Sequence, residues 1–552
     1  MCSRSNLSLL VLLCFLGSQT VFGQNNCRKL FYNQGPQVGV SYNTENGIDL
    51  AMSGDGNLLV LGHAYISDTR WHDITLTKLS PQGNQIWNKN YGFNPFNQTY
   101  PSSEYAESIV QVTSGNGQII LGITRVLGQA DVLLFRTGGN GNVLWSKIIG
   151  GNGSDSPGEV IAISDGNYLF TGDWDLPSSA ETNGLVTKFT AAGNLVWQTA
   201  IHAGQGVTLR LKAVTELPTG EFVVVGSTPD DLYVGKLAAD GTLLQSYGLD
   251  FATNAVGVVD PELKGIDVLP GPAGSVLVLA EVDRGILGDE WTALVELFPD
   301  GSNDITLLEG DDQAPKELIA ISNGEYAIVG ANHDMEVGYL MRFDGNVDYI
   351  GTQAYGISSG IVYLNAIQEV PNGDLMLLGD ISYGNATYIP EGDQVLIRAS
   401  PVGTSSCCGM GNILMTERND PLVRTDFGGA ILPQLTVSTI PQPYMQNANA
   451  GLFPLCVTKT GSQDISANDL DIAGIEVFPN PANEQVQIRW SEEKELQVLQ
   501  LLDMTGKMVQ EIRPDTTSEL SINLSQLPSG IYLIRANISG EWHQKKLTIA
   551  HQ

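Results

Sequence analysis

The sequence predicts an all-β protein: a seven-bladed β-propeller followed by a small C-terminal immunoglobulin-like β-sandwich. Three observations predict this fold: a unit of roughly 50 residues that recurs seven times, short apolar runs bounded by glycine in each unit, and a tail with a different strand pattern. A period of this size with four short strands per unit is typical of a propeller blade, and seven blades fall within the usual range of about four to eight.

A turn glycine before the second strand anchors each unit. It recurs at Gly56, Gly117, Gly166, Gly220, Gly274, Gly324 and Gly373. A small residue follows the apolar run, at Gly62, Gly122, Gly172, Gly226, Ala280, Gly330 and Gly379. Short apolar runs bounded in this way indicate buried strands. We expect the small residue to lie where blades crowd the central channel.

The third strand begins near a polar residue and often carries a basic residue before its end. The polar positions are Asp73, Asp131, Asn183, Asp231, Glu290, Glu336 and Asp393, and the basic ones are Lys78, Lys188, Lys236, Arg342 and Arg398. The fourth strand carries Trp87, Trp145 and Trp197 in the first three units. A residue needed for stacking recurs in every unit, whereas a catalytic residue occurs once or twice. We therefore interpret the recurring acids and tryptophans as structural.

The seventh unit lacks its fourth strand, which predicts that both ends of the chain close the ring. No Gly-x-x-x-Trp pattern follows residues 395–400, whereas residues 28–35 resemble residues 84–92 in pattern. Pairing residues 28–35 into the last blade would remove two open sheet edges, which otherwise invite aggregation. The propeller is thus predicted to span residues 24–404.

The repeat resembles the secreted Bacteroidetes propeller repeats of the form D-G-G-Y-I-x-x-G followed by D-x-Y-L-x-K-L-x-x-x-G-N-x-x-W-x-K-x-Y-G-G. It is also similar to delta-60 and quinoprotein-like repeats. The resemblance covers residues 28–404. It implies the fold and not an activity, because such repeats serve many roles.

Residues 1–23 have the pattern of a secretory signal peptide. Arg4 gives a positive n-region, residues 7–17 form an apolar core, and residues 21–23 form a cleavage site. The apolar core is shorter than the ~20 residues of a bilayer span, so a membrane anchor is disfavoured. No other stretch is apolar and long enough to be a transmembrane segment.

The chain is strongly acidic and retains four cysteines after residue 23. It has 60 acidic against 28 basic residues, a formal net charge of −32, which disfavours nucleic acid as a partner. The cysteines Cys27, Cys407, Cys408 and Cys456 suit disulfides in an oxidising compartment. Cys27 opens the closing strand, so we expect a bridge from Cys27 to Cys407 or Cys408, with Cys456 taking the other. A zinc site is disfavoured because no histidine lies near these cysteines in sequence.

Residues 405–472 do not fit the repeat. They contain three of the four cysteines, and residues 416–451 are rich in proline, asparagine and glutamine. We interpret them as a connector that packs on the propeller or supplies a few strands.

Residues 473–552 form the tail, with seven short strand-like runs and turns that fit a small β-sandwich. The tail closely resembles the C-terminal sorting domain of the type IX secretion system. The matching residues include Phe478, Pro479, Asn480, Pro481, Gly506, Gly530 and Tyr532. The resemblance implies recognition by the type IX secretion machinery, passage from the periplasm through the outer membrane, and a protein on the cell surface or in the medium. An ordinary immunoglobulin-like adhesive domain is the alternative, and we expect a monomer.

No motif for catalysis, a metal or a cofactor is present. The six histidines form no H-E-x-x-H or related spacing, and there is no Gly-x-Ser-x-Gly elbow or phosphate-binding loop. We therefore predict no catalytic residue, no metal site and no cofactor.

Residues that break the repeat lie in loops after the second strand, on one rim of the ring. They are Asp68, Trp71 and His72, then Asp173, Trp174 and Asp175, then Asp283, Arg284 and Asp289, and last His333 and Asp334. Rim loops on a rigid scaffold are where binding groups usually lie, and aromatic and carboxylate side chains together suit sugar recognition. The alternative is a plain solvent-exposed loop.

Three hypotheses for function follow. The first is a secreted or cell-surface, non-enzymatic propeller that binds glycan or protein. The second is a hydrolase or lyase acting on polysaccharide, which would need carboxylates with raised pKa values converging in the channel. The third is a quinone-dependent oxidoreductase, which only the repeat resemblance suggests.

Overall fold

We analysed a computed structural model of the chain. It describes residues 27–32, 45–66, 71–92, 103–125, 130–150, 153–175, 182–204, 206–251, 261–284, 290–310, 312–356, 361–382, 392–405, 409–413, 416–418, 422–426, 430–431, 436–439, 444–447, 450–454, 475–478, 482–483, 485–490, 496–502, 508–513, 519–525, 527–528, 530–538 and 541–549. The chain divides into two units, Met1–Thr458 and Lys459–Gln552. The described residues are almost entirely β-strand, with one short 3₁₀ turn at Pro272–Gly274, which confirms the all-β prediction.

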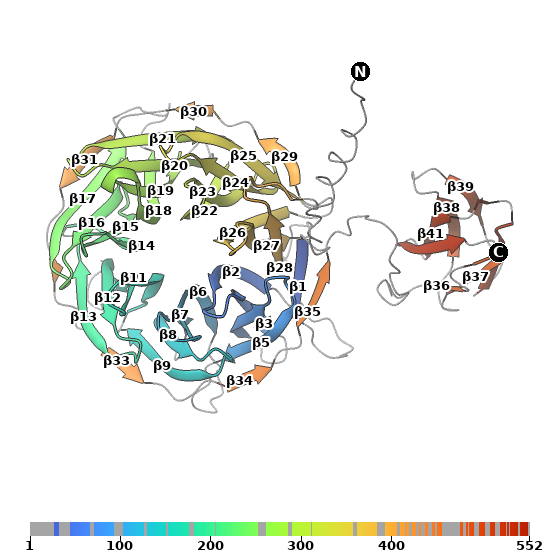
Figure 1. The fold of residues 1–552 in the computed structure, drawn as a ribbon, viewed down its shortest axis with the longest axis horizontal. Helices are drawn as coiled ribbons and strands as arrows, with labels where there is room; N and C mark the ends of the chain where they lie inside the picture. The colour runs from blue at the N-terminus through green and yellow to red at the C-terminus, as the bar shows by residue number, and fades with distance from the viewer. Residues whose placement is uncertain are drawn as a thin grey trace, which may run out of the picture. The chain divides into compact units, whose positions relative to one another are not determined.

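The first unit contains seven antiparallel sheets of five strands each, arranged in a ring (Figure 1). Sheet 1 has β2 (Glu45–Met52), β3 (Leu58–Ile66), β4 (Trp71–Leu79), β5 (Gln85–Gly92) and β34 (Tyr444–Asn447). Sheet 2 has β6 (Glu104–Gln111), β7 (Gln118–Thr124), β8 (Asp131–Thr137), β9 (Val143–Gly150) and β33 (Thr436–Thr439). Sheet 3 has β10 (Ser156–Ala162), β11 (Tyr168–Asp175), β12 (Thr182–Phe189), β13 (Leu195–Ile201) and β32 (Ala430–Ile431).

The remaining four sheets repeat this order from the axis outward. Sheet 4 has β14 (Arg210–Glu216), β15 (Phe222–Ser227), β16 (Leu232–Leu237), β17 (Leu243–Phe251) and β31 (Leu422–Asp426). Sheet 5 has β18 (Glu262–Pro270), β19 (Val276–Asp283), β20 (Glu290–Leu297), β21 (Asn303–Glu309) and β30 (Thr416–Arg418). Sheet 6 has β22 (Gln313–Ala320), β23 (Tyr326–Asn332), β24 (Val337–Phe343), β25 (Tyr349–Tyr355) and β29 (Gly409–Ile413). Sheet 7 has β26 (Ile361–Glu369), β27 (Leu375–Ser382), β28 (Gly392–Ala399), β1 (Cys27–Tyr32) and β35 (Ala450–Pro454).

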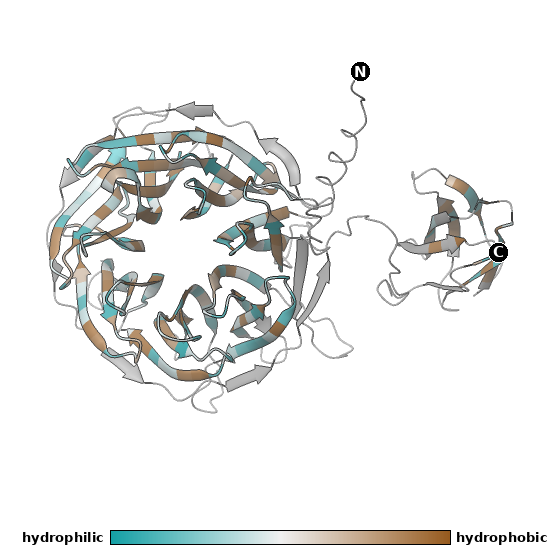
Figure 2. Cartoon of the chain, in the orientation of Figure 1, coloured by the Kyte–Doolittle hydropathy of each residue, from teal (hydrophilic) through white to brown (hydrophobic). Residues whose placement is uncertain are grey.

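Each pair of neighbouring sheets encloses its own hydrophobic core. The core between sheets 4 and 5, for example, includes Val225, Leu249, Val278 and Val295, and equivalent clusters fill the other six interfaces. Figure 2 shows brown, hydrophobic residues along the strands and teal residues at many turns. Because a sheet buries both faces only between two neighbours, the interfaces depend on one another around the ring.

The recurring basic residue of the third strand pairs with an acid at the anchor turn of the same sheet. Nitrogen to oxygen distances are 2.7 Å for Lys78–Asp55, Lys188–Asp165, Lys236–Glu221 and Arg398–Asp374, and 2.6 Å for Arg342–Glu325. The recurring tryptophan bridges to the next sheet, since the indole N–H groups of Trp145 and Trp197 donate to the carbonyls of Ala191 and Ala239. These contacts support the structural interpretation of the tryptophans, and they give the recurring basic residue a structural role as well.

The small residue after the second strand lies against the innermost strand of its own sheet. A Cβ atom at Gly226 or Gly379 would overlap the carbonyl oxygen of Arg210 or Tyr363. At Gly62 the Gln394 amide of sheet 7 occupies the same space as well. Crowding therefore arises mainly within a sheet, and not chiefly between blades as the sequence led us to expect.

The closing strand predicted near the N-terminus is confirmed. β1 pairs antiparallel with β28, with Cys27 opposite Ile397 and Leu30 opposite Gln394. Its other edge pairs with β35, so β1 is covered on both sides. Both terminal parts of the first unit thus complete the seventh sheet.

Residues 409–454 supply one outer strand to every sheet. In chain order, β29 to β35 pair with sheets 6, 5, 4, 3, 2, 1 and 7, so this segment makes a full circuit around the ring (Figure 1). We call it the outer belt. Each belt strand covers the edge of a fourth strand, and covering exposed edges is a recurrent protection against edge-to-edge association. We expected this connector to supply a few strands, and it supplies seven.

Several predictions of the sequence fall outside the described residues. These are the signal peptide at residues 1–23, the side chain of Cys27, and Cys407, Cys408 and Cys456. The expected disulfides therefore remain predictions.

The second unit consists of two antiparallel sheets around one core. One has β36 (Ile475–Phe478), β37 (Gln485–Trp490) and β40 (Glu519–Asn523), and the other has β39 (Met508–Ile512), β38 (Leu496–Leu502), β41 (Gly530–Ile538) and β42 (Glu541–Ile549). Both contribute to the core, which includes Val486, Leu501 and Ile534. Tyr532 is buried and its hydroxyl donates to the Pro528 carbonyl over 3.0 Å. Phe478 ends β36 and Gly530 begins β41, whereas Pro479, Asn480, Pro481 and Gly506 lie outside the described residues.

Deleting residues 24–36 should destabilise the whole first unit. The deletion removes β1, so β28 and β35 lose their shared partner, and each unsatisfied buried backbone group costs about 1–3 kcal/mol. We expect a lower thermal unfolding midpoint for the first unit by calorimetry. Deleting residues 459–552 is the control, since they form a separate unit. An unchanged midpoint after deletion of residues 24–36 would contradict the closure.

Candidate functional site

The innermost strands of the seven sheets surround one cavity of about 330 Å³. Each strand has a bulge at the same place, for example between Gly47 and Asp49 in β2 and between Leu211 and Ala213 in β14. A bulge inserts an extra residue and re-aims its side chain. The residues at the bulges of sheets 1 to 7 are Ile48, Glu107, Gly158, Lys212, Ile266, Lys316 and Asn365, and all of them line this axial cavity.

The position after the bulge joins five of the seven sheets to the next. It holds Asp49, Ser108, Glu159, Asp267 and Glu317, whose side-chain oxygens accept the backbone N–H of Ile109, Val160, Val214, Leu318 and Ile367 over 2.6–3.3 Å. Every one of these donors belongs to the innermost strand of the following sheet. Sheets 4 and 7 have Ala213 and Ala366 at this position and lack the bond. This recurrence shows that four of the five cavity carboxylates are ties between sheets, that is, groups that hydrogen-bond one sheet to the next.

Burial raises the pKa of these four carboxyl groups. The pKa of Asp49 and of Asp267 rises to about 6, because removal from water disfavours the charged form. The pKa values of Glu159 and Glu317 lie well above their ordinary range, for the same reason and through repulsion by the other carboxylates. The N–H bonds that these groups accept act in the opposite direction and limit the rise.

Three charged residues in the cavity depart from the repeat. Glu107, Lys212 and Lys316 occupy bulge positions that hold isoleucine, glycine or asparagine in the other sheets. Lys212 Nζ lies 3.8 Å from Glu107 Oε1. Desolvation raises the pKa of Glu107, and the two lysines oppose that rise. Because stacking does not require these residues, they are the candidate functional groups of the cavity.

The sequence prediction missed these three residues, although a signal was available. The inner strands read NGID (46–49), YAES (105–108), LKA (211–213), KGID (264–267), PKE (315–317) and LNA (364–366). Aligned on the bulge, they show the acid and the two lysines as exceptions in one column. The sequence prediction placed the exceptions to the repeat in the rim loops and not in the inner strands.

Asp173, predicted as a rim binding residue, is another tie between sheets. Its carboxylate accepts the Leu211 N–H of the next sheet over 3.0 Å. Asp380 at the equivalent position of sheet 7 accepts the Gly47 N–H of sheet 1 over 2.7 Å. Desolvation raises the pKa of both carboxyl groups to about 7.

Trp174 is not available for binding, which corrects the sequence prediction. Its side chain is only 5% exposed and belongs to the core between sheets 2 and 3. The physical reason is strand alternation, because residues on either side of Trp174 face away from this core. Asp175 accepts a hydrogen bond from the Thr182 hydroxyl over 2.6 Å, and its N–H donates to Asp155.

The remaining predicted rim residues fall into separate groups. His72 Nδ1 lies 3.2 Å from the Tyr105 hydroxyl, and the two rings are 4.8 Å apart between centroids. Trp71 begins β4, but its side chain lies outside the described residues, as do Asp68 and Asp289. Those predicted rim residues that the structure describes do not form a single site across the different sheets.

Three further predicted residues of the rim have local partners. Asp283 pairs with Lys264 at 2.7 Å, and the Arg284 guanidinium lies 4.1 Å from the centroid of the Trp291 ring. His333 Nδ1 lies 3.3 Å from Asp312 Oδ2, whereas Asp334 is exposed in the following turn.

The comparison with protein families identifies the tail. Residues 476–550 match the model of the secretion system C-terminal sorting domain, as the sequence predicted. This type IX sorting domain indicates export to the cell surface or into the medium, and it implies interaction with the type IX secretion machinery. Among the described residues, no helix has the length and apolar character needed to cross a bilayer.

No curated protein matches the chain in sequence. Three solved structures have low structural similarity to it. A Bacteroides thetaiotaomicron protein of unknown function has 11% identity and a TM-score of 0.31, and covers 66% of this chain and 99% of its own. A Penicillium chrysogenum α-L-arabinanase complexed with arabinobiose has 10% identity and a TM-score of 0.35, and the match covers 68% of this chain and 98% of the arabinanase chain. The rhamnogalacturonan lyase YesW has 9% identity and a TM-score of 0.30, with 67% and 75% covered. All three TM-scores are below 0.5, so we draw no conclusion from them.

The raised pKa values of Asp173 and Asp380 predict that the first unit loses stability as pH rises. Their folded pKa of about 7 exceeds the ordinary value of 3.8, so protonation of the two carboxyl groups stabilises the folded state. This contribution is complete below about pH 3.8 and is lost as the pH rises through 7. We expect a lower unfolding midpoint at pH 8 than at pH 5. Asp173→Asn keeps an acceptor for Leu211 and removes the titration, so the difference between the two midpoints should shrink. An undiminished difference in this variant would contradict the assignment.

Proposed function

We propose that this protein is a secreted or cell-surface seven-bladed β-propeller that binds an acidic glycan in its axial cavity without modifying it. The observation that carries the proposal is the set of three charged side chains, Glu107, Lys212 and Lys316, at bulge positions of the cavity. The other four bulge positions are uncharged, so the charges belong to the site and not to the repeat.

The two lysines supply the preference for an anionic group. Lys212 is 49% exposed, so its ammonium group is open to a ligand in the cavity. The chain as a whole carries a formal charge of −32, so most of its surface repels anions. The ammonium groups of Lys212 and Lys316 are the groups of the cavity that attract an anion. A sugar carboxylate can accept hydrogen bonds from both ammonium groups, and such charge-assisted bonds are the stronger kind.

Glu107 adds the acceptor that a sugar ring needs. Its carboxylate is 32% exposed and lines the same cavity as the two lysines. Sugar hydroxyls donate to carboxylates, so Glu107 suits a ring hydroxyl beside the bound carboxylate. The volume of about 330 Å³ lies at the lower end of the range for ligand pockets, which favours one end of a glycan over an internal stretch.

The export signals complete this proposal. The sorting domain indicates the destination, and we propose that residues 1–23 direct entry into the periplasm and that the four remaining cysteines form disulfides there. An extracellular location gives the cavity access to cell-surface or environmental glycans.

Calorimetric titration of the purified full chain with oligogalacturonate, and with neutral oligosaccharides of the same length, tests the proposal. We expect binding of the acidic glycan, and a loss of at least tenfold in affinity in the K212M/K316M double variant. The matched control is K89M/K147M, which removes two positive charges from the fourth strands β5 and β9. Equal binding by K212M/K316M and the parent chain, or binding of neutral glycans alone, would overturn the proposal.

A second candidate function is polysaccharide hydrolysis or elimination at the same cavity. Carboxylates with raised pKa values do converge there, which is what the enzyme hypothesis requires. Four of the five are ties between sheets, so Glu107 is the remaining candidate for an acid or base. Incubation with oligogalacturonate distinguishes the two functions: shortened products that disappear in Glu107→Gln would favour the enzyme.

A further inference from the structure

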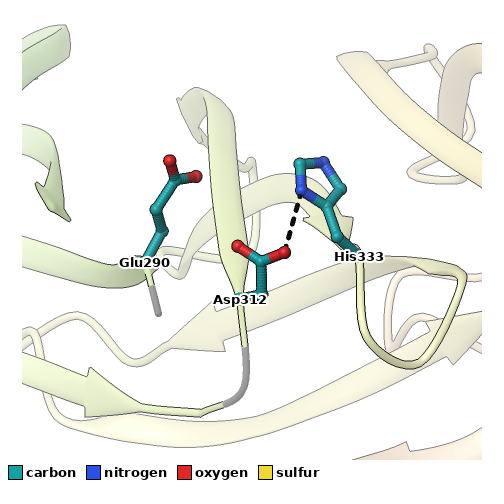
Figure 3. A group of neighbouring side chains, drawn as sticks. All are labelled: Glu290, Asp312 and His333. Carbon is teal, nitrogen blue, oxygen red and sulfur yellow. Dashed lines mark ion pairs between the residues drawn. The ribbon is translucent and has the colours of Figure 1, made fainter. Parts of the chain in front are cut away.

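A second cluster of ligand-type side chains lies at the rim between sheets 5 and 6, apart from the residues that line the axial cavity. It consists of Glu290 at the start of β20, Asp312 directly before β22, and His333 directly after β23 (Figure 3). One atom from each residue, a carboxylate oxygen or a ring nitrogen, lies within 4.8 Å of the other two. Within the described residues, no other group of this kind is found.

The distances suit a small divalent cation. Ligand bonds to zinc are about 2.0–2.2 Å, so two ligands of a tetrahedral site lie about 3.3 Å apart. His333 Nδ1 and Asp312 Oδ2 are 3.3 Å apart, which equals that separation. A ligand atom of Glu290 also lies within 4.8 Å of the other two, and rotation of its half-buried side chain would shorten this separation to complete the set.

The two fixed ligands are held by bonds that do not involve their ligand atoms. The backbone N–H of His333 donates to the carbonyl of Asp312 over 2.9 Å, so the two residues remain adjacent. The His333 ring packs edge-on against Tyr363 of sheet 7, with 5.6 Å between centroids. An aromatic neighbour restricts the rotation of the imidazole without occupying its nitrogens, and Nδ1 faces Asp312.

Local charge also favours a cation. The carboxylates of Glu281, Asp283 and Asp312 lie close enough to Glu290 to act on its charge, so negative charge is concentrated at this place. Lys264 is the nearby base, but it pairs with Asp283 at 2.7 Å and lies 3.4 Å from Glu262 and 3.7 Å from Glu281. Its charge is thus shared among three other carboxylates.

The histidine of this cluster is not a feature of the repeat, whereas Glu290 occupies the recurring polar position of the third strand. The same backbone bond joins the Arg125 N–H to the Ser103 carbonyl within sheet 2, over 3.0 Å. Arg125 and Ser103 therefore occupy the places of His333 and Asp312 there, and an arginine cannot bind a cation. Acidic residues at this rim are found in another sheet as well. In sheet 3, Asp155 lies directly before β10 and Asp175 ends β11, and the Asp175 N–H donates to the Asp155 carboxylate. The imidazole of His333 is therefore what distinguishes the interface of sheets 5 and 6.

We propose that Glu290, Asp312 and His333 bind one divalent cation of the zinc and manganese class. The imidazole selects this class over calcium and magnesium, which prefer oxygen ligands alone. Three protein ligands leave at least one coordination position open to water or to an oxygen of an exogenous ligand. The rim thus gains a cation that can contact a carboxylate or hydroxyl group from outside.

Titration of the metal-stripped full chain, with its thiols blocked by alkylation, tests this proposal. Zn²⁺, Mn²⁺ and Ca²⁺ are added separately and binding is followed by calorimetry. We expect one equivalent of Zn²⁺ to bind, Ca²⁺ to bind at least tenfold more weakly, and both His333→Ala and Asp312→Asn to lose at least tenfold in Zn²⁺ affinity. Asp334→Asn is the matched control, because Asp334 is exposed in the same turn and is not in the cluster.

Glu290→Gln gives a second, independent variant, and unfolding midpoints without metal verify that each variant is folded. Zn²⁺ affinity equal to that of the parent chain in the His333 and Asp312 variants would overturn the proposal. Tighter binding of Ca²⁺ than of Zn²⁺ would overturn it as well, since the imidazole would then not be a ligand. The outcome does not depend on whether a glycan binds in the axial cavity.

Discussion

Closure of the ring is the constraint on which the rest of the first unit depends. Each of the seven interfaces has a separate hydrophobic core, and a missing interface would leave the faces of two sheets in water. The interface between sheets 7 and 1 joins residues more than 300 positions apart. There the amide of Asn365 donates to the Gly47 carbonyl, and the amide of Gln394 donates to the Asn46 carbonyl, over 2.8 and 2.9 Å. The first strand then completes sheet 7, so the ring closes through both side chains and backbone.

The same constraint explains why so many acids of this chain do not point to function. Carboxylates after the inner bulge, and those after the small residue, accept backbone N–H groups of the next sheet. They are buried, and their pKa values are raised, for a structural reason. Perturbed pKa values are commonly used to find active sites, but structural networks produce them as well. In a repeat protein, the better criterion is departure from the repeat, and by that criterion Glu107, Lys212, Lys316 and His333 are the informative residues.

The outer belt covers the outer edges of the sheets, which closure of the ring leaves exposed. In a closed ring of four-stranded sheets, both faces of every sheet are covered by the neighbouring sheets. The outermost strand of each sheet still has one edge with unpaired backbone groups. Residues 409–454 cover these edges one after another and return to the sheet where the chain began. Residues 409–454 precede residues 476–550 in the chain, so every strand of the ring and of the outer belt lies N-terminal to the sorting domain.

The amino-acid sequence by itself determined the fold class, the closing strand and the export domain. The repeat of glycine turns and apolar runs predicts strands, since these patterns act locally, and the sorting motif is contiguous in the tail. Only the tertiary structure decided which side chains meet. Trp174 follows a rim-like pattern but faces a core, and Asp173 meets Leu211 of another sheet. Glu107, Lys212 and Lys316 converge because bulges in three different sheets turn them toward one axis. Glu290, Asp312 and His333 come together because their strands begin and end at one rim, a proximity across 43 residues that no local pattern encodes.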